Sequence, residues 1–122
     1  MIEYDLDTEH SILDARPTAP LEQEDFVNLA KAVDPHIEAT GGLAGIIVDA
    51  PRFPGWESFG ALVSHLRFVR DRHQHVKKVA VVTDSRLGEV AERLASHFVS
   101  AEIKQFPAGQ TDAARQWITS GS

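Results

Sequence analysis

Leu43-Ala44-Gly45-Ile46-Ile47-Val48 is a near-continuous apolar run of strand length, and Val79-Ala80-Val81-Val82-Thr83 is a second one. Runs that are apolar on both faces are typical of central strands in a parallel sheet. Between them an apolar stripe recurs at the spacing of a helix, and it consists of Phe59, Leu62, Val63, Leu66 and Val69. Strand, helix and strand in this order predict a right-handed crossover in an α/β layer structure.

The residues before this unit predict a hairpin and one helix. Ile2, Tyr4 and Leu6 alternate with acidic residues and a second short apolar segment follows, as expected of an antiparallel hairpin at a sheet edge. The helix is indicated by a second apolar stripe, formed by Phe26, Leu29, Ala30, Val33 and Ile37. We expect Asp34-Pro35 to interrupt this helix and Gly41-Gly42 to end it.

The residues after this unit predict a helix, a strand and a final helix. Helical spacing recurs after Ser85 in a stripe formed by Leu87, Val90, Ala91, Leu94 and Phe98. Residues 101–106 alternate as in a strand nearer an edge, and residues 111–118 have the pattern of a short helix. We therefore expect a single α/β domain over residues 1–122, with a mixed sheet, an N-terminal hairpin and about four helices.

Composition excludes several classes of site. The chain has 122 residues and no cysteine, so disulfides, thiolate metal sites and cysteine nucleophiles are excluded. No apolar run approaches the roughly 20 residues that cross a bilayer, and we expect a cytosolic protein. Phosphate-loop, nucleophile-elbow and zinc-protease motifs are absent, and no cofactor is indicated. The net charge of −6 gives no support for nucleic-acid binding.

Two sets of polar residues allow a catalytic or metal-binding interpretation. Asp49 and Asp84 end the two central strands, where their carboxylates could converge to hold Mg²⁺ or to act as acid and base. The favoured interpretation is that they cap a helix and fix a turn. His73-Gln74-His75 has a chelating spacing without a visible third ligand, so a solvated helix end is favoured over a zinc site.

The loop Pro51-Arg52-Phe53-Pro54-Gly55-Trp56 is the most informative segment for function. Its two large aromatic residues follow a buried strand, at the edge where α/β proteins bind ligands. On the next helix, Phe68 lies about 160° from the centre of the apolar stripe, so we expect its ring to point away from the sheet. Contact with an apolar ligand is thus predicted for Phe53, Trp56, Phe59, Leu62 and Phe68. The alternative is that the loop aromatics seal the core and that Phe68 packs against a neighbouring helix.

Basic residues gather toward the end of the same helix. Arg67, Arg70 and Arg72 are predicted to meet an anionic head group or a membrane surface. The alternative is that these cations only complement the carbonyl end of the helix dipole on a solvated face.

Six short segments follow one another in an order typical of a known family. They are Glu24-Asp25-Phe26, Ile46-Ile47-Val48-Asp49, Phe53-Pro54-Gly55-Trp56, Val79-Ala80-Val81-Val82-Thr83-Asp84, Ala101-Glu102-Ile103-Lys104-Gln105-Phe106 and Ala114-Arg115-Gln116-Trp117-Ile118. Together they cover nearly the whole chain and resemble the SpoIIAA-like family. The resemblance implies the fold of the STAS domains, with any pocket bordered by the second and third helices and the loop before the second. It also implies binding of small apolar ligands and association with membranes.

The fold also includes anti-sigma-factor antagonists, which implies a regulatory alternative with a protein partner. Antagonists carry an Asp-Ser-Ser-Gly-like segment at the start of the second helix, where a kinase modifies a serine. Here the segment is Gly55-Trp56-Glu57-Ser58-Phe59, which leaves Ser58 as the candidate for phosphorylation. We therefore predict a non-enzymatic module that binds a small apolar or lipid-like ligand and contacts membranes peripherally. STAS-type regulation through protein–protein interaction is the alternative.

Overall fold

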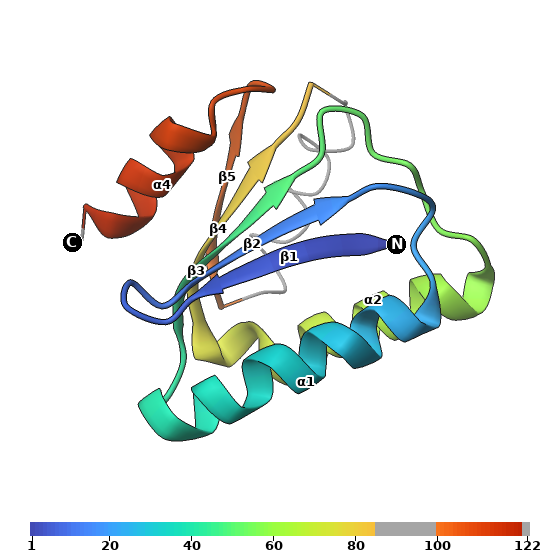
Figure 1. Cartoon of the computed structure of the whole chain (residues 1–122), viewed down its shortest axis with the longest axis horizontal. Coiled ribbons are helices and arrows are strands. Elements are labelled where there is room, and N and C mark those ends of the chain that lie inside the picture. The colour runs from blue at the N-terminus through green and yellow to red at the C-terminus, as the bar shows by residue number, and fades with distance from the viewer. Residues whose placement is uncertain (85–99, 121–122) are drawn as a thin grey trace.

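The computed structural model describes residues 1–84 and 100–120, which contain one five-stranded mixed sheet (Figure 1). The strands lie in the order β1-β2-β3-β4-β5. Only the β1–β2 pair is antiparallel among the described strands, which confirms the N-terminal hairpin. The strand bounds are β1 Ile2–Asp7, β2 Ile12–Pro17, β3 Leu43–Asp49, β4 Val76–Val82 and β5 Glu102–Phe106.

Helices cover both faces of the sheet. Helix α1 (Gln23–Thr40) and helix α2 (Phe59–Arg72) lie side by side on one face, and helix α4 (Thr111–Thr119) lies on the other (Figure 1). A single 3₁₀ turn, η1 (His73–His75), joins α2 to β4. The helix expected between residues 87 and 98 lies outside the described residues, so the described part contains three α-helices instead of the expected four.

The core consists of two apolar clusters, one on each face of the sheet. The cluster beneath α1 and α2 is formed by Leu13, Leu21, Phe26, Leu29, Val33, Leu43, Val76 and Ala101. The cluster beneath α4 is formed by Ile12, Ile47, Ala80, Val82, Phe106, Ala114 and Ile118. Neighbouring residues of β2, Ile12 and Leu13, therefore pack on opposite faces, and this strand of the hairpin is buried on both sides.

Helix α1 is continuous, so the expected interruption at Asp34-Pro35 is wrong. Pro35 lies inside the helix and removes one backbone donor. Val33 and Ile37, on either side of it, both pack against the core cluster, and this packing outweighs the loss of one hydrogen bond. The helix ends as expected at Gly41, whose φ of 91° lies in the left-handed region that favours glycine.

Helix α4 approaches β3 closely at a glycine. A Cβ atom added to Gly45 would lie 2.7 Å from side-chain atoms of Ile118. Ile118 is only 4% exposed, so its side chain has little room to move. The absence of a side chain at position 45 therefore sets how near α4 lies to the sheet.

Candidate functional site

The aromatic loop between β3 and α2 is fixed to the chain just before α1. Trp56 forms an isolated parallel bridge with Leu21. The Leu21 N–H donates to the Gly55 carbonyl oxygen and the Glu57 N–H donates to the Leu21 carbonyl oxygen, both at 2.8 Å. Gly55 has a φ of 82°, a conformation that glycine adopts without strain. The backbone at Trp56 is therefore held in place on both sides of the residue.

The loop side chains join a stack of rings that reaches α1. The Trp56 Nε1–H donates to Nδ1 of His65 at 3.1 Å, and the Phe53 and Trp56 rings meet edge to face at 5.0 Å. On its other side His65 stacks on Phe26, with ring centroids 4.9 Å apart. Burial in this apolar environment lowers the pKa of His65, because the charged imidazolium loses its hydration.

Phe68 does not point away from the sheet, so its expected orientation is wrong. Its ring packs against the core cluster and lies 5.9 Å from the ring of Phe26 on α1. Residues at the same helical spacing, Ala61 and His65, share this inward face of α2. The alternative interpretation, in which Phe68 packs against a neighbouring helix, is confirmed.

The apolar stripe that was expected to cover the sheet forms a second face of α2. Phe59 is 79% exposed and Leu66 is 61% exposed, and half-buried Leu62 and Val63 lie on the same side of the helix. At 100° per residue this stripe is centred about 130° from the inward face. The predicted ligand residues therefore separate into three places: Phe53 and Trp56 in the loop, Phe59 and Leu62 on the outward stripe, and Phe68 in the core.

The three arginines also separate. The guanidinium group of Arg72 donates two hydrogen bonds to the Asp34 carboxylate, both at 2.9 Å, and lies 4.3 Å above the Phe68 ring. This side chain is 18% exposed and ties α2 to α1. Arg67 and Arg70 are exposed on the outer surface. Arg70 donates to Asp71 at 2.9 Å, which lowers the pKa of that carboxyl group.

Ser58 caps the N-terminus of α2. Its hydroxyl oxygen accepts a hydrogen bond from the Ala61 N–H at 3.1 Å, so the helix begins at Phe59. The residue is exposed and immediately precedes the helix that carries the apolar stripe.

Two of the residues considered as catalytic or metal ligands, Asp84 and His73, bond to backbone N–H groups. The Asp84 carboxylate accepts the Ala108 N–H at 3.0 Å and thereby fixes the loop after β5, while Asp49 lies beside Asp14. Burial, with a smaller contribution from Asp49, raises the pKa of Asp14. Nδ1 of His73 accepts the Ser100 N–H at 3.0 Å. Across residues 1–84 and 100–120, no three acidic or histidine side chains gather as a metal would require.

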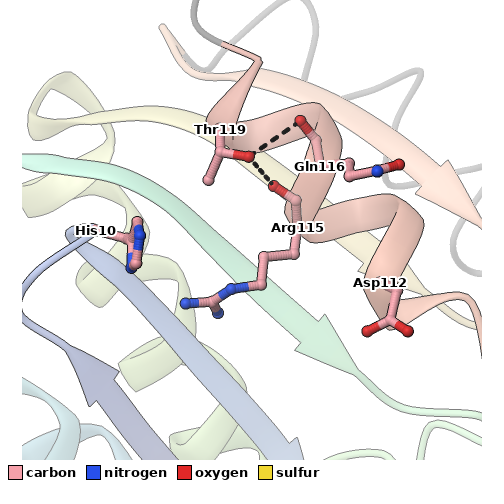
Figure 2. Close-up of a pocket in the computed structure, with 5 residues that line it drawn as sticks. All are labelled: His10, Asp112, Arg115, Gln116 and Thr119. Carbon is pink, nitrogen blue, oxygen red and sulfur yellow. Dashed lines mark hydrogen bonds between the residues drawn. The ribbon is translucent and has the colours of Figure 1, made fainter.

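A hollow of about 530 Å³ lies between the hairpin turn and α4 (Figure 2). It is lined by five residues with polar side chains: His10, Asp112, Arg115, Gln116 and Thr119. The side chains of His10 and Arg115 both bond to one carboxylate oxygen of Asp7. The pKa of Asp7 is lowered, mainly by the hydrogen bond from the His10 backbone N–H and next by the bond from the His10 ring. His10 and Arg115 therefore already have a partner in Asp7, and none of the five lining residues carries a large apolar side chain.

His65 and Phe26 are the members of the aromatic stack that the sequence analysis did not select. The available signal was the spacing of Ala61, His65, Phe68 and Arg72, which places all four on one side of a helix. This side of the helix does not stand out as apolar, because it contains a histidine and an arginine. The His65 ring stacks on Phe26 and the Arg72 guanidinium group bonds to Asp34, and no local sequence pattern indicates these contacts with α1.

Comparisons with known proteins agree with this fold. A search of curated proteins gave no match. A solved structure of an uncharacterized protein of the DUF3478 family from Shewanella loihica, described as having a SpoIIAA-like fold, superposes with a TM-score of 0.75. It is 21% identical, and the match covers 97% of this chain and 92% of that one, which supports the fold. The sequence profile of the SpoIIAA-like family matches residues 12–119. The chain belongs to the SpoIIAA-like family.

Proposed function

We propose that the protein is a non-enzymatic binding module whose ligand is an apolar chain with an anionic head group, held along the outward face of α2. The observation that carries the proposal is the exposure of Phe59 and Leu66, on a helix whose other face already packs against the core. A soluble domain seldom leaves two large apolar side chains aligned in this way without a ligand or partner. The STAS-like fold is compatible with such a binding role.

The positions of the apolar stripe and of Arg67 and Arg70 define the orientation in which the ligand would bind along α2. From Phe59 to Arg70 the helix rises about 16 Å, which is roughly the length of an extended fatty acid of a dozen carbons. The apolar end would lie against Phe59 and Leu62, and the head group would lie near Arg67 and Arg70. A guanidinium group binds a carboxylate or a phosphate equally well, so the head group is defined by its charge.

The same chemistry is offered by an anionic membrane surface. No helix within the described ranges has the length and hydropathy to cross a bilayer. Contact would therefore be peripheral, through the exposed stripe and the two arginines. A free fatty acid and a bilayer of anionic lipid are distinguished by testing the two separately.

We expect the double variant Phe59→Ser, Leu66→Ser to bind the fluorescent fatty acid dansyl-undecanoic acid about tenfold more weakly than the wild type, because two side chains lose their apolar contact with the chain. The measurement is a fluorescence titration. The matched control is Val27→Ser, which removes another exposed apolar side chain, 51% exposed on α1, and is expected to leave the affinity unchanged.

The contribution of the head group is tested with the double variant Arg67→Gln, Arg70→Gln. Its matched control is Lys31→Gln, which removes a charge from the exposed surface of α1. The arginine variant should weaken binding of the acid but not of its uncharged methyl ester. Co-sedimentation with phosphatidylglycerol vesicles forms the membrane arm. If the wild type ignores both the fatty acid and the vesicles, or if the serine variant binds them as well as the control does, the proposal is wrong.

A further inference from the structure

The hydrogen bond between Trp56 and His65 depends on the protonation state of the histidine. An indole N–H can only donate, so Nδ1 of His65 must present a lone pair at the observed 3.1 Å. An imidazolium carries a proton on both nitrogens and has no acceptor. The contact seen in the structure therefore requires neutral His65, with its proton on Nε2.

The environment of His65 favours that neutral form. Its ring lies between the Phe26 ring, stacked at 4.9 Å, and the Trp56 ring, at 5.9 Å. Burial is the cause of its lowered pKa, and no charged group contributes. Protonation would therefore place a charge between two aromatic rings and at the same time remove the hydrogen bond to the indole.

Three acids lie on the segments that pack around this stack, at the start of α1 and in the loop. Asp25 accepts the N–H groups of Ile2 and Glu22. Glu57 is hydrogen-bonded to Glu22, which raises the pKa of Glu57. Of the basic residues on α2 itself, Arg67 and Arg70 are exposed on its outer side. Arg72 shares the inward face with His65, where its guanidinium group lies over the Phe68 ring and bonds to Asp34. Glu57 is thus the group whose titration must be separated from that of His65.

We propose that the Trp56 side chain is a gate over the aromatic stack, closed while His65 is neutral and opened when His65 is protonated. The backbone at Trp56 is fixed to Leu21, so only the indole has to move. Its departure would uncover His65 and the edge of Phe26, which is 6% exposed in the closed form. The ring movement does not rest on the proposed function, because the proposed ligand lies on the other side of α2, around Phe59 and Leu66.

The movement is measured in a Trp117→Phe background, in which Trp56 is the only tryptophan, since the sequence contains two. On lowering the pH from about 8 to about 5, we expect a single red shift of Trp56 emission and stronger quenching by acrylamide, with a midpoint below the ordinary histidine value of about 6.5. Far-UV circular dichroism, recorded in parallel, should remain that of the folded protein.

Two variants at position 65 separate the gate from a structural role. In His65→Asn the side-chain oxygen can accept from the indole and does not titrate, so emission should remain that of the closed form across the range. In His65→Phe the ring is kept without an acceptor, so emission should be red-shifted already at about pH 8. Rescue by asparagine but not by phenylalanine is a result that loss of packing alone would not produce.

Several outcomes would overturn the gate. A pH step that persists in His65→Asn, or that disappears in Glu57→Gln, would assign the transition to the carboxyl groups. An emission spectrum of His65→Phe that equals the wild-type spectrum at about pH 8 would show that the hydrogen bond does not hold the indole.

Discussion

Replacing Phe68 with alanine is expected to lower the free energy of unfolding by about 2–4 kcal/mol, since the ring packs against the core and Phe26. The expected loss extends down to about 2 kcal/mol because Phe68 is only partly buried. The substitution also removes the surface on which the Arg72 guanidinium lies. Urea denaturation monitored by circular dichroism gives the measurement, with the slope of the transition confirming that the unfolded states are comparable.

The matched control is Phe59→Ala on the same helix. Phe59 is 79% exposed, so its removal should change the free energy of unfolding by less than about 0.5 kcal/mol. The pair tests the orientation of α2 directly, because the apolar pattern of the sequence predicts the opposite order. A larger loss for Phe59→Ala than for Phe68→Ala would mean that α2 presents its other face to the sheet.

Gly45→Ala is expected to cost about 2–3 kcal/mol, because the added methyl group would meet Ile118 at 2.7 Å. In an ordinary strand the same change is neutral or favourable, since alanine is less flexible than glycine in the unfolded chain. The cost should therefore come from displacement of α4. Thermal or urea unfolding measures it.

Gly60→Ala is the matched control for Gly45→Ala. Its added methyl group would meet only the end of the Gln23 side chain, which can rotate away, and alanine favours the helix by up to about 1 kcal/mol. A second arm combines Gly45→Ala with Ile118→Ala, and the double variant should lose less than the two single variants together. Strict additivity would mean that the contact with Ile118 is not the source of the cost.

Strand positions could be predicted from the sequence because their signal is local. The alternation at Ile2, Tyr4 and Leu6 corresponds to strand β1, and the continuous apolar runs correspond to β3 and β4. In β1 the burial follows the pattern only in part, because Ile2 and Leu6 pack against the core while Tyr4 is exposed. The expected interruption at Pro35 is wrong for a physical reason. A proline removes one backbone hydrogen bond from the helix, and the apolar residues on either side of it contribute more through packing.

The orientation of α2 could not be predicted because its inward face contains polar side chains. His65 and Arg72 are suited to that face only through partners on α1, the Phe26 ring and the Asp34 carboxylate. Such partners lie far away in the sequence. The same limit applies to the candidate site. The two loop aromatics could be predicted because they are large rings in a loop that follows a buried strand, whereas the hydrogen bond between Trp56 and His65 follows from tertiary packing.

The order of the strands in the sheet is the order in which they are synthesised. Each new strand can therefore dock on the one synthesised just before it, and none has to be threaded between two that are already joined. The face around Ile12 and Ile47 is the exception, because α4, which covers it, is translated after all five strands. A nascent chain stalled before residue 111 should leave this face of the sheet uncovered, and we expect holdase chaperones to bind it until α4 has emerged from the ribosome.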